Sequence, residues 1–187
     1  MVPRPRPIPM VRLAFASMAL LFAACAGPNR WGYARDYAPT PAERSAEQGA
    51  KPLDAAMAEL KPEEWRGKKV ELFLIIDERK DAVGGAAAYL TGKMHVRNAI
   101  NGCANKHDED SCRVTVKPGA GAVVHVQTAI APEDREGELR VGKGTLLHVI
   151  GTLRASVDEV DGKLVVDASF YRQWPIGYYA FEGDLLQ

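Results

Sequence analysis

The chain has 187 residues, of which 47% are hydrophobic and 26% charged, enough for one domain with a substantial core. Its 24 Lys and Arg equal its 24 Asp and Glu. Affinity for phosphate groups needs a surplus of positive charge, so this balance argues against a nucleic-acid binder. We therefore expect no nucleic-acid partner.

Residues 1–24 have the features of an export signal. Arg4, Arg6 and Arg12 precede an apolar run from Leu13 to Ala24, and no acidic residue lies before it. The run is too short to span a bilayer, which takes about 20 residues, and it has the length of a signal-peptide core. A start at Met10 instead of the first residue would give a more compact leader.

The end of this run, Leu21-Phe22-Ala23-Ala24-Cys25, resembles the lipobox of bacterial lipoproteins, in which cleavage precedes a cysteine that becomes lipidated. The resemblance implies that Cys25 carries acyl chains such as palmitate, and that membrane lipid is a partner. Ala26, where inner-membrane lipoproteins have Asp, implies the outer membrane of the cell envelope, with the domain in the periplasm. Ordinary secretion and an uncleaved anchor are the alternatives.

Residues 25–51 are rich in Ala, Pro, Gly and charge, which predicts a flexible tether. Within it, Trp31, Tyr33 and Tyr37 are expected either to pack back on the domain or to contact a partner. Cleavage after residue 24 would remove three Arg and leave 21 Lys and Arg against 24 acids, so the mature chain would be mildly acidic.

The remaining residues, 52–187, are predicted to form one mainly β domain. Apolar residues from Leu53 to Leu60 follow helical spacing, which indicates a short helix that ends near Pro62. Alternation with a period of two, and turn residues such as Asp161-Gly162, then predict about six strands. We expect these at 70–76, 88–98, 113–116, 122–128, 145–154 and 164–171. With no βαβ rhythm, they indicate a small antiparallel barrel or sandwich.

The segment from Val141 to Leu153 resembles a late strand of an OB-fold, with one glycine opening the strand and another permitting its coil. Together with Cys112–Val116 and Tyr171–Pro175, it is also similar to a group of uncharacterised bacterial envelope lipoproteins. The resemblances imply an OB-like β-barrel and an envelope location. They imply no activity.

Cys103 and Cys112 are an even pair once Cys25 is lipidated, and the polar loop between them favours a disulfide in an oxidising compartment. On the chain-entropy account, this bridge contributes about 2.7 kcal/mol. The alternative is a metal site that adds His107, Asp108 and Asp110 to the two thiols, although the spacing is wider than zinc sites use.

The sequence contains no nucleophile elbow, zinc helix or phosphate loop, so we expect no catalytic residue, no cofactor and no bound metal. Strand alternation directs His95 and His125 outward and leaves the facing of His148 open. A site formed by these three histidines is conceivable. The alternative function is a small periplasmic metal-dependent hydrolase that uses His148.

A C-terminal cluster is rich in aromatic residues and contains one arginine. Its partner-binding candidates are Tyr171, Arg172, Trp174, Tyr178 and Tyr179. It is expected to act either as a packed latch that closes the barrel or as an exposed surface for a partner. We therefore expect a non-catalytic envelope lipoprotein that binds an envelope protein or polysaccharide, or a purely structural accessory of an envelope assembly.

Overall fold

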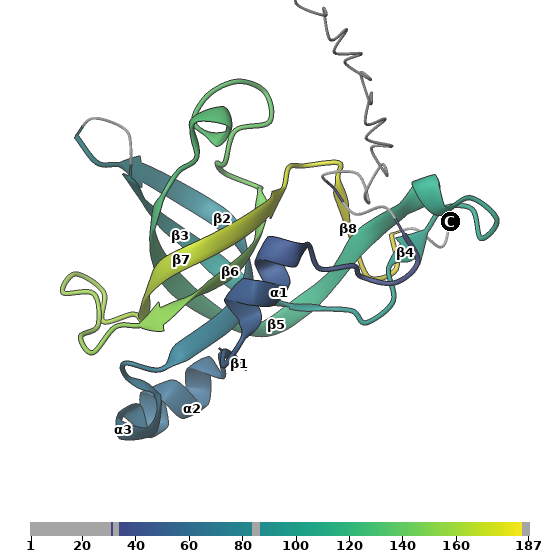
Figure 1. The fold of residues 1–187 in the computed structure, drawn as a ribbon. Coiled ribbons are helices and arrows are strands. Elements are labelled where there is room, and N and C mark those ends of the chain that lie inside the picture. The colour runs from purple at the N-terminus through teal and green to yellow at the C-terminus, as the bar shows by residue number, and fades with distance from the viewer. Residues whose placement is uncertain (1–30, 32–33, 84–86, 185–187) are drawn as a thin grey trace, which may run out of the picture.

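The computed structural model describes residues 31, 34–83 and 87–184, which form a barrel with an extension at one side (Figure 1). The helical elements are α1 (Pro41–Glu47), α2 (Ala55–Leu60), α3 (Pro62–Trp65), η1 (Glu109–Ser111) and η2 (Pro132–Asp134). The strands are β1 (Lys51–Pro52), β2 (Lys69–Asp81), β3 (Ala87–Arg97), β4 (Gly102–Cys103), β5 (Cys112–Ala129), β6 (Leu146–Leu153), β7 (Val165–Trp174) and β8 (Tyr179–Phe181). No helix within the described part is long and apolar enough to cross a membrane.

Five strands close the barrel in the order β2, β3, β5, β7 and β6, and β6 pairs again with β2. Every pair is antiparallel except β5 with β7, which is parallel. A closed five-stranded barrel with this connectivity is the OB fold. The predicted mainly β, OB-like barrel is therefore confirmed, although five strands rather than six form its wall.

The barrel is filled by the alternation that the sequence shows. Along β2, the side chains of Val70, Leu72, Leu74 and Ile76 are buried, while their neighbours face outward. Each fully buried aliphatic side chain of this size contributes about 1.5–3 kcal/mol. Gly151 in β6 lies so close to β7 that an added Cβ would meet the Asp167 carbonyl oxygen at 2.3 Å. A glycine is therefore required where these strands coil together.

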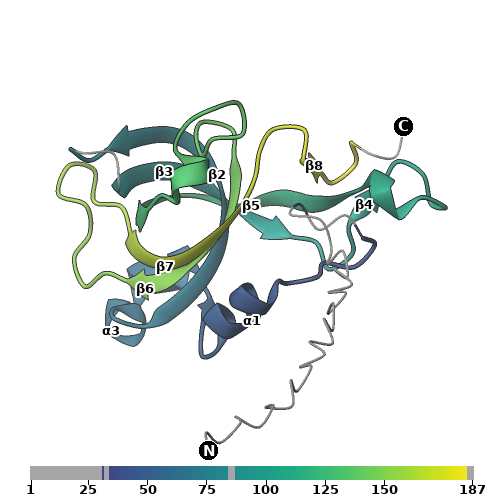
Figure 2. The same cartoon turned by 45° about the horizontal axis from the view of Figure 1, so that its top comes forward.

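The strands expected at 113–116 and 122–128 are one continuous strand, β5. Lys93 of β3 pairs with Val123, whereas His95 pairs with Pro118, so residues 119–122 bulge out of the ladder. The turn residues at 118–121 therefore bend the strand instead of reversing the chain, because a bulge inserts extra residues into one strand. Figure 2 shows β5 leaving the barrel toward β4 and β8.

Residues 25–51 were expected to form a flexible tether, but the described part of this segment packs on the barrel. Thr40 caps α1 in a capping box with Glu43, and Pro41 occupies the first helical turn. The helix lies across the outside of the barrel (Figure 1). The Tyr37 ring packs on the Phe73 ring, with 6.1 Å between their centroids. Trp31 and Tyr37 thus pack back on the domain, whereas Tyr33 and Cys25 lie outside the described residues.

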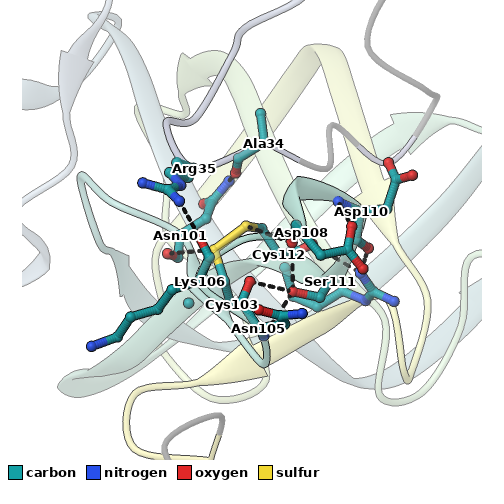
Figure 3. The surroundings of a disulfide bond; sticks show 12 residues. Ala34, Arg35, Asn101, Cys103, Asn105, Lys106, Asp108, Asp110, Ser111 and Cys112 are labelled. Atoms are coloured by element: carbon teal, nitrogen blue, oxygen red, sulfur yellow. Dashed lines mark hydrogen bonds between the residues drawn. A yellow bond between two sulfur atoms is a disulfide. The ribbon is translucent and has the colours of Figure 1, made fainter.

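The extension is formed by β4, the first half of β5, and β8. Cys103 and Cys112 form a disulfide there, as predicted (Figure 3). Since zinc binds thiolates, the alternative metal site with His107, Asp108 and Asp110 has lost its two sulfur ligands. The Asn101 side chain donates a hydrogen bond of 2.8 Å to the Ala34 carbonyl, which ties the N-terminal segment to this extension.

The β6–β7 hairpin forms as Asp161-Gly162 predicts, with Gly162 at φ +71° in its turn. The connection from β5 to β6 contains the single 3-10 turn η2 and no α-helix. It is held by Asp134, whose carboxylate accepts hydrogen bonds from the Tyr171 hydroxyl (2.8 Å) and the Gln173 amide (2.5 Å). These bonds replace the packing that a helix would supply.

Candidate functional site

The interior of the barrel is occupied by aliphatic side chains, so any chemistry of the described residues lies on its outer wall. Two polar regions of this wall contain histidine residues. One is a buried network beneath α1, on β2, β6 and β7. The other is a partly exposed row of side chains on β3, with neighbours from β5 and β8.

The buried network is centred on the Glu43 carboxylate of α1, which is fully buried. His148 Nδ1 lies 2.7 Å from Oε1, and Arg172 donates to Oε2 at 2.9 Å. Tyr37 and the backbone N–H of Thr40 donate to the same carboxylate. A buried carboxylate is tolerated when its lone pairs are satisfied in this way.

His148 is also enclosed from its other sides. Its ring stacks on Phe73, with 4.2 Å between centroids and 2° between planes. Its Nε2 lies 3.8 Å from the Glu71 carboxylate. Burial alone would lower the pKa of His148, but hydrogen bonds and charge from Glu43 and Glu71 outweigh it and raise the pKa. The imidazolium form is therefore favoured.

The pKa of Glu43 moves in the opposite direction. Burial alone would raise it from the ordinary 4.5, but the hydrogen bonds from His148 and Tyr37 and the charge of Arg172 lower it to about 2. The network thus holds an ionised carboxylate against an imidazolium and a guanidinium. It clamps α1 to the barrel, and its enclosure gives no substrate access to His148.

In the structure, each of the five C-terminal candidates contacts another part of the domain. Arg172 and Trp174 are buried, and the Trp174 indole N–H donates to the Trp31 carbonyl at 2.8 Å. Tyr171 donates to Asp134 on another part of the barrel, and burial raises its pKa to about 12.

Tyr178 packs against Trp31 at 4.6 Å between ring centroids, and the Tyr179 hydroxyl donates to the Gly144 carbonyl. The cluster therefore forms the latch that was one of its two expected roles. Burial removes Arg172 and Trp174 from any surface that a partner reaches.

The second region follows every other residue of β3, and we call it the β3 stripe. It consists of Tyr89, Thr91, Lys93, His95 and Arg97. Lys93 is exposed and the other four are half-buried. None of these five outward positions is acidic.

Two aromatic neighbours from adjacent strands extend the stripe. His125 of β5 stacks on Tyr89 with 5.1 Å between ring centroids, and Phe181 of β8 lies 5.8 Å from His95. Phe181 is 38% exposed. His95 and His125 therefore face outward, as predicted, whereas His148 lies beneath α1. The three histidines do not come together in one site. The carboxylates beside His125 are those of Asp158 and Asp161 in the β6–β7 loop.

A groove of about 230 Å³ adjoins the stripe where β1 and β3 diverge along β2. Its walls include Leu53, Phe73, His95 and Arg97, and Glu71 contributes a carboxylate. Arg97 lies with its guanidinium carbon 4.2 Å from the Tyr37 ring centroid. This end of the stripe thus offers apolar walls beside a cation.

Glu43 is the residue that sequence reasoning missed. It lies in a segment whose composition predicts a tether, yet Thr40, Pro41 and Glu43 have the spacing of a capping box. That signal predicts a helix. It does not predict the burial of its glutamate, which depends on His148 and Arg172 far along the chain.

Comparisons with known proteins found matches only among solved structures: no protein-family model and no curated protein matches the chain. One matched structure is a small single-stranded DNA-binding protein from Streptomyces coelicolor, at 13% identity and a TM-score of 0.31, covering 55% of this chain and 90% of that one. Another is the protein PriB from Ralstonia solanacearum, at 14% identity and a TM-score of 0.27, covering 57% and 97%.

A third is a deletion mutant of the single-stranded DNA binding protein from Thermus aquaticus, at 20% identity and a TM-score of 0.28, covering 60% of this chain and 53% of that one. Similarity at this level concerns the fold, which the strand order establishes independently.

These findings correct two predictions. The matched structures include two single-stranded DNA-binding proteins. The prediction of an envelope protein or polysaccharide as partner, with a His148 hydrolase as alternative, is contradicted, and so is the exclusion of nucleic acid. The exclusion rested on total charge, which ignores how charge is distributed over the wall.

Proposed function

We propose that this protein binds single-stranded nucleic acid along the β3 stripe. The observation that carries the proposal is the alternation of aromatic and cationic side chains on the outer face of β3, in an OB barrel. The corresponding face of OB folds is formed by the second and third barrel strands, which here are β3 and β5.

The stripe supplies both interactions that a single strand needs. Lys93 and Arg97 offer positive charge to phosphates, and no outward position from Tyr89 to Arg97 is acidic. Tyr89 and His95 offer ring faces on which bases can stack, a sequence-tolerant interaction worth about 1–3 kcal/mol per base. At roughly 3.3 Å per residue, the stripe spans about 26 Å, the length of a short oligonucleotide segment.

The groove beside Arg97 gives the strand a second point of attachment. Its apolar walls at Leu53 and Phe73 suit an unstacked base, and the Arg97 guanidinium lies at its edge. A duplex does not offer its bases in this way. We therefore expect a preference for single strands over duplex of the same sequence.

Charge sets the strength of binding. The whole chain has no net charge, so attraction to phosphate is local to the stripe. We expect weak affinity that falls with salt, with a slope of about −0.7 per phosphate contact on a logarithmic plot.

The test is fluorescence anisotropy of a labelled 15-nucleotide oligothymidine with the purified full-length chain at low and moderate salt. The variant Lys93→Glu should weaken binding at least fivefold, because it places a negative charge in the stripe. Lys68→Glu makes the same charge change at an exposed position outside the stripe and serves as the matched control. Absence of binding at low salt, or equal losses in both variants, would overturn the proposal.

We also propose that the chain is anchored by lipid at Cys25 in the outer membrane, with the barrel in the periplasm. The support is the basic, apolar and lipobox-like order of residues 1–25. Metabolic labelling with a radioactive fatty acid should mark the wild-type chain and not Cys25→Ala. Label on both, or on neither, would contradict the anchor and leave the nucleic-acid proposal to its own test.

A further inference from the structure

We propose that His125, Asp158 and Asp161 form a binding site for a divalent transition-metal ion, with Zn²⁺ as the best fit. Each residue offers one ligand atom, and these three atoms all lie within 4.8 Å of one another. They come from strand β5 and from the β6–β7 loop that closes over it. The site lies at the Tyr89 end of the β3 stripe but does not depend on nucleic-acid binding.

The imidazole of His125 is held in the orientation that a ligand requires. Its side chain is buried on the barrel wall, and Nδ1 lies 2.9 Å from the Thr91 hydroxyl oxygen. The Tyr89 ring covers one of its faces. These contacts direct Nε2 toward the loop, where Asp161 Oδ2 lies at 2.9 Å. Such outer hydrogen bonds are what fix metal-binding histidines.

The two aspartates are held by the backbone of their own loop. Asp158 Oδ1 accepts the N–H of Val160 at 2.8 Å, and Asp161 Oδ1 accepts the N–H of Lys163 at 3.0 Å. The second oxygen of each carboxylate is thus directed away from the loop backbone. Asp158 Oδ2 accepts the Tyr89 hydroxyl at 2.6 Å, an outer contact that orients this carboxylate as well.

The hydrogen bonds of His125 also suit metal binding. When the ion binds Nε2, the single proton of the neutral imidazole lies on Nδ1, where the Thr91 hydroxyl oxygen can accept it.

The donor set determines which ion fits. One imidazole nitrogen with two carboxylate oxygens favours Zn²⁺ and similar transition ions, whereas Ca²⁺ and Mg²⁺ prefer oxygen ligands alone. The Asp161 side chain is 41% exposed, which leaves room for water as a further ligand.

A second group of possible ligands, Glu43, Glu47 and His148, lies in the clamp beneath α1. There the Glu43 carboxylate already accepts hydrogen bonds from Arg172 and Tyr37. An ion would have to displace them, so we assign the site to His125.

Calorimetric titration with ZnCl₂ tests the site. The chain should carry Cys25→Ala, because that thiol would itself bind Zn²⁺. One ion should bind, and Asp161→Asn and His125→Gln should each weaken it at least tenfold. Thr91→Val removes only an outer contact and should weaken it about tenfold, within the 10–100-fold range that such contacts carry.

Glu159→Gln is the matched control, since it removes an exposed carboxylate from the same loop. Circular dichroism checks that each variant is folded. Should His125→Gln fail that check, the variants of the exposed Asp161 and the half-buried Asp158, Asp161→Asn and Asp158→Asn, decide. An NMR shift of the His125 ring nitrogens on adding Zn²⁺ would place the ion. Binding that is absent, or that Asp161→Asn and Glu159→Gln alter equally, would overturn the proposal.

Discussion

The barrel wall holds two histidines in nearly the same local arrangement. His148 stacks on Phe73 and lies 2.7 Å from a Glu43 oxygen, while His125 stacks on Tyr89 and lies 2.9 Å from an Asp161 oxygen. The difference lies in the carboxylate. Glu43 is fully buried beneath α1, whereas the Asp161 side chain is 41% exposed.

This difference in exposure gives the two carboxylates different roles: Glu43 stabilises the fold, whereas Asp161 is available to bind an ion. A buried ion pair that loses one member leaves an uncompensated charge, so the Glu43 clamp is held together by its own enclosure. An exposed pair of the same chemistry loses little when it is broken, because water replaces the lost partner. An ion can therefore enter between His125 and the loop carboxylates, while Glu43 cannot leave His148.

The largest expected effect is that of Glu43→Gln on the free energy of unfolding. The substitution keeps the shape of the side chain but removes the charge that faces His148 and Arg172, so we expect a loss of about 3–5 kcal/mol. Urea denaturation followed by tryptophan fluorescence measures it, because Trp31 and Trp174 lie beside the clamp.

Glu59→Gln removes an exposed carboxylate from helix α2 and controls for the general effect of such a change. If Glu43→Gln costs no more than Glu59→Gln, the clamp is not what holds α1 to the barrel. The contrast between the two histidines would then lose its basis.

The next effect is the pH dependence of this clamp. The pKa of Glu43 is lowered from 4.5 to about 2, so its contribution to stability is complete above pH 4.5 and lost as the pH falls toward 2. The pKa of His148 is raised above 6.5, so its contribution is complete below pH 6.5 and lost as the pH rises through the raised value.

Amide hydrogen exchange of α1, corrected for the intrinsic pH dependence of exchange, should therefore show the strongest protection between about pH 4.5 and 6.5. Protection that keeps increasing above neutral pH would contradict the assigned charge on His148.

Local pattern was enough to predict most of the fold. The alternation from Val70 to Ile76, the Asp161-Gly162 hairpin and the glycines around β6 identify strands and a turn from neighbouring residues alone. The bulge in β5 was predicted as a chain reversal. Proline and glycine at 118–121 indicate a break in regular pairing, but only the partner strand decides whether the chain turns back or continues.

The polar regions could not be predicted in the same way, because their members are distant in sequence. Glu43 contacts residues 105 and 129 positions away, and His125 contacts a carboxylate 36 positions away. Strand alternation correctly directed His95 and His125 outward. Which side chain meets each one depends on how α1 and the β6–β7 loop fold over the barrel.

The smallest expected effect completes the comparison. In metal-free buffer, Asp161→Asn should leave the urea midpoint almost unchanged, because this carboxylate is exposed and its hydrogen bond to His125 is replaced by water. In buffer with Zn²⁺, the wild-type chain should gain stability by mass action, whereas Asp161→Asn should gain much less. Denaturation of both chains with and without Zn²⁺ measures this difference. A large loss in metal-free buffer would mean that the His125 cluster is a second structural clamp, since only an enclosed ion pair makes its own removal costly.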